Sequence, residues 1–530
     1  KMREISNRNV AFVKKQMPLD QAIAFFKERH QPYKAELLED LKKFGTTKIS
    51  EEERKDLGET PAMATIYETG KFIDLCRGPH VASTRELKTF KLLKIAGAYW
   101  RGKETNPMLT RLYGTAFPTQ QELDEYLKFL EEAEKRDHKK LGPQLDLFMM
   151  HETAPGMPYW LPKGLIIINE LTKFWRQEHE KRGYQEIKSP LLNKKELYET
   201  SGHWDHYQEN MFIIKTPEGE TYIPKPMNCP NAMVVFKNKL HSYRDLPLRL
   251  SDTDTLHRFE LSGTLQGLLR VREFSQDDAH IFITEDQIKE EYRRILDITK
   301  RFYSVFKIDY SFRLGTRPKE YLGDKNTWDK AEKELKAILE ASGKPYTILE
   351  GDGAFYGPKI DILMKDSLKR EWQMGTIQLD FQIPRRFNLT YIDKDGSEKT
   401  PVVVHRVIYG SFERFVGILI EHFAGAFPLW LSPAQIQVIP VGSRHEKPSR
   451  KLAKELAEIG LRVHVDDLNE TVGYKIRKAE KQKVPYMLVI GDKEAKGIKL
   501  TIRVRGEKNT LEITKKKFME RLLKEIERKK

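Results

Sequence analysis

The segment 256–282 places arginines, carboxylates and a histidine within one short stretch of chain. Its arginines, Arg258, Arg270 and Arg272, lie on either side of a small-residue turn at Ser262-Gly263. Guanidinium groups match the oxygens of a phosphate and stay charged, so this pattern suits a nucleotide phosphate. The alternative is a solvated face of a sheet, because charged residues at alternating strand positions are common without a ligand.

The end of this segment, with Asp277, Asp278 and His280, suits a ligand that carries an amine or a metal ion. Cys229 and His405 are two more residues of ligating type, far away in the sequence. Three protein ligands with an open fourth position are typical of a working zinc site. A single cysteine and two single histidines are more often core residues, so their spacing alone leaves that alternative open.

The elements that must position these residues form three segments, because a chain of 530 residues is too long for one core. Residues 1–118 mix short strands and helices. A helix over 119–142 follows, begun by a capping box of Thr119 and Glu122, and its charged second half suits a linker between domains. After a large middle segment, residues 432–530 alternate strands and helices, which predicts an α/β layer with a mostly parallel sheet.

The composition indicates the class of partner. A net charge of +15 favours a polyanion, either nucleic acid or an acidic membrane surface. No apolar run is long enough to span a bilayer, which excludes a membrane-spanning class. Only two cysteines occur, Cys76 and Cys229; their number allows one disulfide, but such low usage predicts a cytoplasmic protein. The chain begins at Lys1 with no apolar signal segment, and we expect it to be a fragment of a longer cytoplasmic protein.

Three strings resemble the signature motifs of class II aminoacyl-tRNA synthetases, and within them of the threonyl-tRNA synthetases. Segment 256–282 resembles motif 2, GSFERF at 410–415 resembles motif 3, and 183–190 resembles motif 1, the dimer-forming element. The strings PMNCP, QDDAH and VHR resemble the zinc-ligand segments of the same family. The resemblance implies that residues 143–431 form an α+β catalytic domain whose antiparallel sheet is flanked by helices. It also implies one Zn²⁺ per subunit, bound in the amino-acid pocket by Cys229, His280 and His405.

The resemblance further implies roles for single residues. The residues that match the family's ATP contacts are Arg258, Glu260, Arg270, Phe274 and Arg414. The resemblance also implies that Mg²⁺ bridges the ATP phosphates. Those matching threonine contacts are Met227, Gln276, Asp278, Tyr356 and Gln378. Arg258 would bridge the amino-acid carboxylate and the α-phosphate, with Lys359 as a further cation near the reacting groups. His203 matches a histidine near the ribose of the tRNA end and is a candidate base for the transfer step.

The resemblance extends to both flanks of the catalytic segment. Residues 432–530 resemble the family's α/β anticodon-binding domain, in which the positions that read bases match Asn469, Arg477, Glu494 and Arg503. Residues 1–118 resemble part of its α+β editing domain, in which active-site positions match Lys34, Asp74, Cys76 and His80. The family's other editing half, a His-x-x-x-His pair, is missing here. We expect it to precede Lys1, so that the editing site of this chain is partial.

Together these patterns predict a ligase that activates threonine with ATP and transfers it to the 3′ end of tRNA(Thr), as a cytoplasmic homodimer with no membrane association. One departure leaves substrate behaviour open: Asn231 and Ala232 stand where the family usually has a small residue and a histidine. A first alternative is a seryl- or prolyl-type synthetase, which shares motifs 2 and 3 without requiring the Cys/His/His set. A second is an RNA-binding or regulatory protein that has lost catalysis, against which the retained Arg258 and Arg414 argue.

Overall fold

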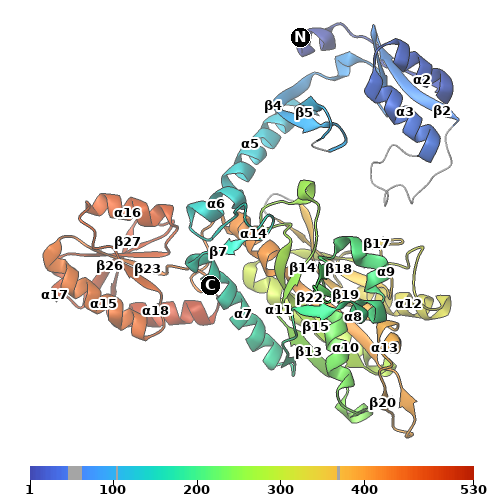
Figure 1. Cartoon of the computed structure of the whole chain (residues 1–530). Helices are drawn as coiled ribbons and strands as arrows, with labels where there is room; N and C mark the ends of the chain where they lie inside the picture. Colours follow the sequence, from blue (N-terminus) through green and yellow to red (C-terminus); the bar gives the residue numbers. More distant parts are fainter. Residues whose placement is uncertain (46–61, 103–104, 367–369, 530) are drawn as a thin grey trace. The chain divides into compact units, whose positions relative to one another are not determined.

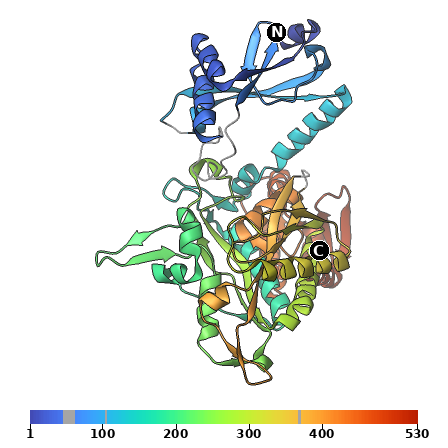
Figure 2. The same cartoon turned by 90° about the vertical axis from the view of Figure 1, so that its right-hand side faces the viewer.

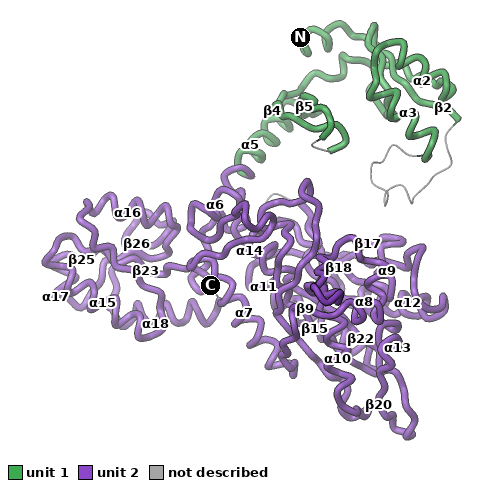
Figure 3. Tube along the Cα trace, viewed as in Figure 1, with its two compact units in different colours: residues 1–132 green, residues 133–530 purple. Residues whose placement is uncertain are grey.

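The computed structural model describes residues 1–45, 62–102, 105–366 and 370–529. The chain divides into two compact units, Lys1–Glu132 and Ala133–Lys530 (Figure 3). None of the helices in the described ranges combines the length and the apolar character that crossing a membrane requires.

The first unit is an α+β structure. Two helices pack their apolar sides on a three-stranded antiparallel sheet, order β1-β2-β3, and a long hairpin of β4 and β5 follows. The bounds are α1 (Met2–Asn7), β1 (Val13–Pro18), α2 (Leu19–Glu28), α3 (Pro32–Phe44), β2 (Met63–Thr69), β3 (Phe72–Leu75), β4 (Thr89–Tyr99) and β5 (Met108–Phe117). This unit agrees with the α+β class expected for residues 1–118.

The expected linker over 119–142 comprises two helices, α5 (Gln120–Arg136) and α6 (His138–Gln144). The predicted capping box is present, because the Thr119 backbone N–H donates to Glu122 at 3.0 Å and the Glu122 N–H donates to the Thr119 hydroxyl at 3.2 Å. Asp137 interrupts the helix and caps the second one, its carboxylate accepting the Lys139 N–H at 2.9 Å. The break exists because a capping aspartate starts a new helix here.

The second unit is built on a large sheet, seen in Figure 1 and, turned by 90°, in Figure 2. It has nine strands with the order β17-β16-β18-β19-β22-β15-β13-β8, and β14 pairs with β15 at its side. Pairing is antiparallel except for β16 with β17 and β13 with β8. The strands are β8 (Gln185–Glu186), β13 (Leu248–Asp252), β14 (Thr255–His257), β15 (Glu273–Ile283), β16 (Tyr310–Gly315), β17 (Tyr346–Leu349), β18 (Lys359–Lys365), β19 (Glu371–Asp380) and β22 (Val402–Ser411). The predicted antiparallel catalytic sheet is confirmed.

Alternation along these strands separates a packed face from a polar one. Residues such as Ile281 and Val404 join one large core with helices on their side of the sheet. These helices are α7 (Pro162–Glu180), α11 (Ile288–Phe306), α12 (Lys325–Ser342) and α14 (Phe412–Phe423). The neighbouring residues, among them His280 and His405, point to the other face, where α10 (Cys229–Lys237) and α13 (Ile383–Arg386) pack around a smaller core.

Residues after 432 form a five-stranded sheet, order β24-β23-β25-β26-β27. Strands β24, β23 and β25 pair in parallel, and β26 and β27 add to them in antiparallel pairing. The expected mostly parallel sheet is therefore extended by one antiparallel hairpin. Helices α15 and α18 cover one face and α16 the other (Figure 1). The bounds are β23 (Ile436–Pro440), α15 (Glu446–Glu458), β24 (Val463–Val465), α16 (Val472–Lys481), β25 (Tyr486–Ile490), α17 (Asp492–Lys496), β26 (Lys499–Val504), β27 (Thr510–Thr514) and α18 (Lys515–Glu527).

Candidate functional site

Four predicted site residues form a row across four adjacent strands of the large sheet. Lys359 on β18 lies opposite Gln378 on β19, which lies opposite His405 on β22, which in turn lies opposite His280 on β15. Residues directly opposite on paired strands share a face, with their Cβ atoms about 5 Å apart. The register of the sheet therefore brings together residues that are distant in the sequence.

Cys229 is the first residue of α10, the helix that packs on the same face of the sheet as this row. The ligand atoms of Cys229, His280 and His405 all lie within 4.8 Å of one another, and all three residues are buried. Burial, followed by the nearby carboxylates of Asp278 and Asp380, raises the pKa of the Cys229 thiol well above its ordinary value. A buried thiolate here therefore needs a cation beside it.

The hydrogen bonds around these three residues fit a metal ion. His405 shares a hydrogen bond of 2.8 Å between its Nε2 and Asp380 Oδ2, and the other oxygen of Asp380 accepts backbone N–H groups of Gln382 and Ile383. This holds the His405 ring and leaves Nδ1 as its ligand atom. Among the described residues, His280 Nδ1 has no hydrogen-bond partner although it is buried. One sulfur and two nitrogen donors are a set that Zn²⁺ prefers.

The adjacent carboxylates of Asp277 and Asp278 have different environments. Asp278 lies on the face of the histidines, opposite Asp252, and accepts a hydrogen bond from Asn228 Nδ2 at 3.2 Å. Asp277 points to the other face at a β-bulge, where its carboxylate accepts the backbone N–H groups of Ile408 and Gly410, each at 3.1 Å. Burial raises the pKa of Asp277 to about 7. Asp278 thus faces the site, whereas Asp277 holds the bulge.

Tyr356 and His203 line the same buried region. The Tyr356 hydroxyl donates a very short hydrogen bond to Gln378 Oε1, and its ring lies 5.3 Å from that of His405. His203 Nε2 lies 3.6 Å from Cys229 Sγ, and its Nδ1 lies 2.8 Å from the hydroxyl of Ser201. His203 is fully buried, so it is not a surface histidine. Burial is the main cause that lowers its pKa to about 3, so the ring is neutral.

Three further predicted residues lie on segments next to the ligand set. Met227 and Gln276 are partly buried, the former two residues before Cys229 and the latter near the start of β15. Lys359 is held by two carboxylates, with its Nζ 3.1 Å from Asp352 and 3.3 Å from Asp361. Contact of these three with a substrate stays a prediction.

The predicted phosphate-binding arginines come together at the other end of β15. Arg258 lies over the Phe274 ring, 5.0 Å from its centre, and donates through Nε to the Pro226 carbonyl at 3.2 Å. Arg270 is half-exposed and pairs with Glu260 at 2.8 Å. Phe274 itself is buried, so its stacking on adenine stays a prediction.

Arg414 completes this cationic cluster from the first turn of α14. Its Nε donates to the Leu269 carbonyl at 2.9 Å and its Nη1 to the Gln373 carbonyl at 3.1 Å. Burial, then the positive charges of Arg258 and Arg270, lower the pKa of Arg414. Like charges held this close indicate a site for a polyanion, because an anion relieves their repulsion.

Three of the predicted anticodon residues lie on one side of the C-terminal sheet, and Asn469 lies in a nearby loop. Glu494 accepts the Thr501 hydroxyl at 2.7 Å, and Arg503, two residues along β26, is exposed on the same face. Arg477 lies on α16, which packs on that face, and Asn469 is exposed in the preceding loop. The contact of all four with single-stranded bases stays a prediction.

The predicted editing residues form two pairs in the first unit. Lys34 and Asp74 make an ion pair of 2.6 Å. Cys76 Sγ lies 3.2 Å from His80 Nε2, and the His80 ring stacks on Phe12. A thiol beside an imidazole is suited to bind or activate a ligand.

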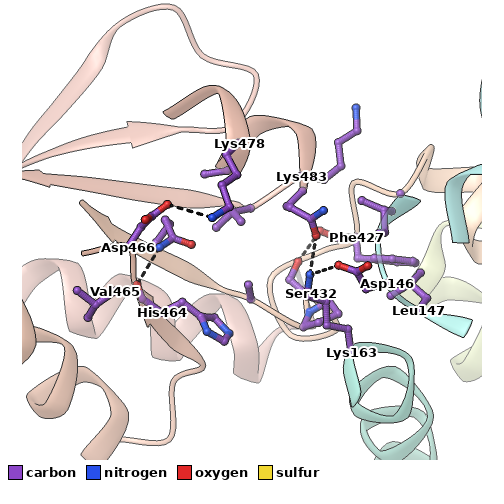
Figure 4. A pocket seen from close by; sticks show the side chains of 18 of the residues that line it. Asp146, Leu147, Lys163, Phe427, Ser432, His464, Val465, Asp466, Lys478 and Lys483 are labelled. Atoms are coloured by element: carbon purple, nitrogen blue, oxygen red, sulfur yellow. Dashed lines mark hydrogen bonds and ion pairs between the residues drawn. The ribbon is translucent and has the colours of Figure 1, made fainter. Parts of the chain in front are cut away.

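A separate cavity of about 480 Å³ lies between the start of α7 and the C-terminal sheet (Figure 4). Lys163, His464, Asp466 and Lys478 are among its lining side chains. Of the described residues that line it, none belongs to the predicted site. The chemistry is therefore assigned to the sheet face and not to this cavity.

The sequence patterns did not identify two residues that contact the predicted site residues. Asp380, which holds His405, lies two positions after Gln378 on the same strand and hence on the same face. Alternation in the string GTIQLDF is a signal that could have found it. Asn228, which donates to Asp278, directly precedes Cys229 and had no distinguishing pattern of its own.

Three family models match the chain. The tRNA synthetase class II core domain (G, H, P, S and T) matches residues 212–423. The anticodon binding domain matches residues 435–525. The threonyl and alanyl tRNA synthetase second additional domain matches residues 64–113.

Known proteins are similar over most of the chain. The threonine–tRNA ligase of Thermotoga neapolitana is 51% identical over 526 residues, which are 99% of this chain and 79% of that protein. The ligase of the same name from Carboxydothermus hydrogenoformans is 51% identical over 510 residues, 96% of this chain and 78% of its own length. A crystal structure described as the RNA binding domain of threonyl-tRNA synthetase from Cryptosporidium parvum superposes with a TM-score of 0.71 at 42% identity, covering 73% of this chain and 98% of that one.

Proposed function

The chain belongs to the family of threonine–tRNA ligases, and we propose that it selects threonine with a Zn²⁺ ion held by Cys229, His280 and His405. The observation that carries this is the approach of their three ligand atoms to within 4.8 Å in a buried place. Membership makes the chain a class II aminoacyl-tRNA synthetase and excludes the seryl- and prolyl-type alternative. When bound, the ion supplies an open coordination position for the amino and hydroxyl groups of threonine.

The chain's own residues complete the amino-acid pocket in this proposal. Asp278 accepts a hydrogen bond from the threonine hydroxyl, and Tyr356 and Gln276 lie at the amine, with Met227 and Gln378 as walls. Valine has nearly the same shape, and an apolar pocket separates such pairs only about 100-fold. Because valine lacks the hydroxyl, it leaves buried Asp278 without that donor, which costs more than the loss of a contact. Serine keeps the hydroxyl and lacks one methyl, a difference of only about 1–3 kcal/mol, so it is rejected weakly.

Activation joins the threonine carboxylate to the α-phosphorus of ATP and releases pyrophosphate. We assign Arg258 to the carboxylate and α-phosphate, Arg270 with Glu260 to the outer phosphates, and Arg414 and Phe274 to the two faces of adenine. The cationic cluster is already assembled in the chain, so neutralising the developing charge requires little rearrangement. Class II enzymes use Mg²⁺ with ATP, and Lys359 is a further cation near the reacting groups.

The remaining roles concern tRNA(Thr). We propose that Asn469, Arg477, Glu494 and Arg503 contact its anticodon, and that His203 lies near its terminal ribose. Cys76 and His80, with Lys34 and Asp74, form one part of a site that removes serine from mischarged tRNA. A homodimer and a cytoplasmic location stay predictions.

The deciding experiment is ATP–pyrophosphate exchange with threonine, serine or valine, before and after zinc removal by a chelator. We expect strong exchange with threonine, weak exchange with serine, none with valine, and loss of activity without zinc. Exchange with valine, or full activity without zinc, would show that the three ligand-type residues are only structural. Absence of exchange with any amino acid would instead support the RNA-binding alternative without catalysis.

A further inference from the structure

We propose that His138 is a positioning residue for ATP, because its imidazole joins the loop that carries Arg270 to the helix that carries Arg414. This inference rests on the proposed assignment of those two arginines to ATP. His138 is the first residue of α6 and is 1% exposed. Helices α6 and α14 lie side by side (Figure 1).

Both ring nitrogens of His138 are used. The backbone N–H of Leu268 donates to Nε2 at 3.1 Å, and Nδ1 lies 2.7 Å from Glu421 Oε1. Since Nε2 accepts a hydrogen bond, Nδ1 carries the ring's hydrogen, and this N–H donates a hydrogen bond to Glu421 Oε1. The ring thereby connects a loop residue of motif 2 with a residue of α14, the helix that begins within motif 3.

Each partner of the ring is close to an arginine of the cationic cluster. Leu268 is two residues before Arg270, and the next carbonyl along the loop, that of Leu269, accepts Arg414 Nε at 2.9 Å. Glu421 follows Arg414 by seven residues on α14, which is about two turns and places both on one side of the helix. His138 and Arg414 are thus two separate links between the same loop and the same helix.

The loop rests tightly on the imidazole. Gly267 has a φ of +53°, and a Cβ at this position would lie 2.3 Å from His138 Nε2. A side chain at residue 267 would therefore displace the loop from the ring. The oxygen and nitrogen atoms of Asp137, His138 and Glu421 also come close enough to hold a metal ion. With both ring nitrogens already in hydrogen bonds, positioning is the better assignment for His138.

The first test measures KM for ATP and KM for threonine in the exchange reaction. For His138→Ala we expect KM for ATP to rise about tenfold, because the buried N–H of Leu268 loses its acceptor, while KM for threonine stays near that of the parent chain. His138→Gln places a side-chain oxygen at the same number of bonds from Cα as Nε2, so it should recover part of the loss. The matched control is His241→Ala, another buried histidine, whose Nε2 lies 3.0 Å from the Phe236 carbonyl.

A second test leaves the imidazole in place. Gly267→Ala should raise KM for ATP in the same way, because its Cβ pushes the loop off the ring. Gly343→Ala is the control, since Gly343 also has a positive φ, +67°, but a Cβ at this position would meet no atom within 4 Å among the described residues. This comparison separates displacement of the loop from backbone strain, and it remains informative if His138→Ala fails to fold.

The inference is overturned if His138→Ala and Gly267→Ala raise both KM values alike, or leave KM for ATP unchanged. Calorimetry then measures the binding of Mg·ATP to the parent chain and to both variants. This measurement separates a wrong role for His138 from a wrong assignment of the activity. If the parent chain binds ATP but shows no threonine-dependent exchange, the assigned activity fails. Weaker ATP binding by the two variants would still support the role of His138.

Discussion

His280 and His405 lie directly opposite each other on neighbouring antiparallel strands, with their ring centres 4.9 Å apart. The pair exists because β15 and β22 are hydrogen-bonded in one register. A slip of either strand by one residue would turn that strand's histidine toward the apolar core on the other face. Cys229 adds the third ligand from a helix packed over that face. The ligand set therefore depends on strand register first and on helix packing second.

The two cysteines of the chain provide a matched comparison for the metal site. We expect Cys229→Ser to lower zinc content from about one ion per chain toward zero, because a hydroxyl is a much poorer zinc ligand than a thiolate. Elemental analysis of the purified protein measures this directly. Cys76→Ser should retain zinc, since Cys76 is not one of the three proposed ligands. Zinc retained at full stoichiometry in Cys229→Ser would contradict the assignment.

Asp380 should matter for metal affinity although it is not itself a proposed ligand. Asp380→Asn keeps an oxygen for the backbone N–H groups of Gln382 and Ile383 but presents an amide in place of the carboxylate to His405. Loss of such an outer partner lowers metal affinity about 10–100-fold. Competition with a chelator of known affinity measures the change. An unaltered affinity would mean that Asp380 serves only to terminate β19.

Burial of Glu413 predicts a pH dependence of stability. Its pKa is raised to about 8, mainly by burial, and its carboxyl group accepts the Ser275 N–H at 3.0 Å. A raised carboxyl pKa means that the folded chain keeps a proton that the unfolded chain has lost. The stabilisation is therefore complete below the ordinary pKa of 4.5 and is lost as pH rises toward 8.

The variant Glu413→Gln cannot ionise and should lose this dependence. We expect the stability of the variant, relative to that of the parent chain, to increase steadily between pH of about 5 and about 8. The slope is up to about 1.4 kcal/mol of unfolding free energy per pH unit, and it is followed by the difference between the two melting temperatures. Asp277, whose pKa is raised in the same direction, is present in both chains and cancels from the difference. A constant difference in melting temperature across this range would show that Glu413 is already ionised in the folded chain.

Arg503 separates tRNA recognition from amino-acid activation. We expect Arg503→Ala to raise KM for tRNA(Thr) about tenfold, as for the loss of one charged hydrogen bond, while ATP–pyrophosphate exchange is unchanged because it requires no tRNA. Charging and exchange assays on the same preparation provide the comparison. Lys454→Ala, on α15 at the opposite face of the sheet, is the control and should alter neither assay. Equal effects of the two substitutions would remove Arg503 from the anticodon contacts.

Several features of the site were predictable from local sequence. The class II motifs predicted the antiparallel catalytic sheet, the family and the enzyme class, and the comparisons confirm these. The capping box at Thr119 and Glu122 was also predictable, because its atoms are three residues apart and need no distant partner. The break at Asp137 was not, since the charged pattern continues through it while the chain starts a new helix there.

What only the tertiary structure decided is how distant residues face one another. The sequence places Asp277 and Asp278 side by side as equal candidates, and a β-bulge turns one toward the backbone of β22 and the other toward the ligand set. It shows His138 only as one residue of a charged linker, whereas packing buries it between the motif 2 loop and the helix that begins within motif 3. Residue types and short-range spacing are properties of the sequence itself. Register, facing and burial depend on pairing between segments far apart in the chain, and these arise only when the sheet and its helices pack together.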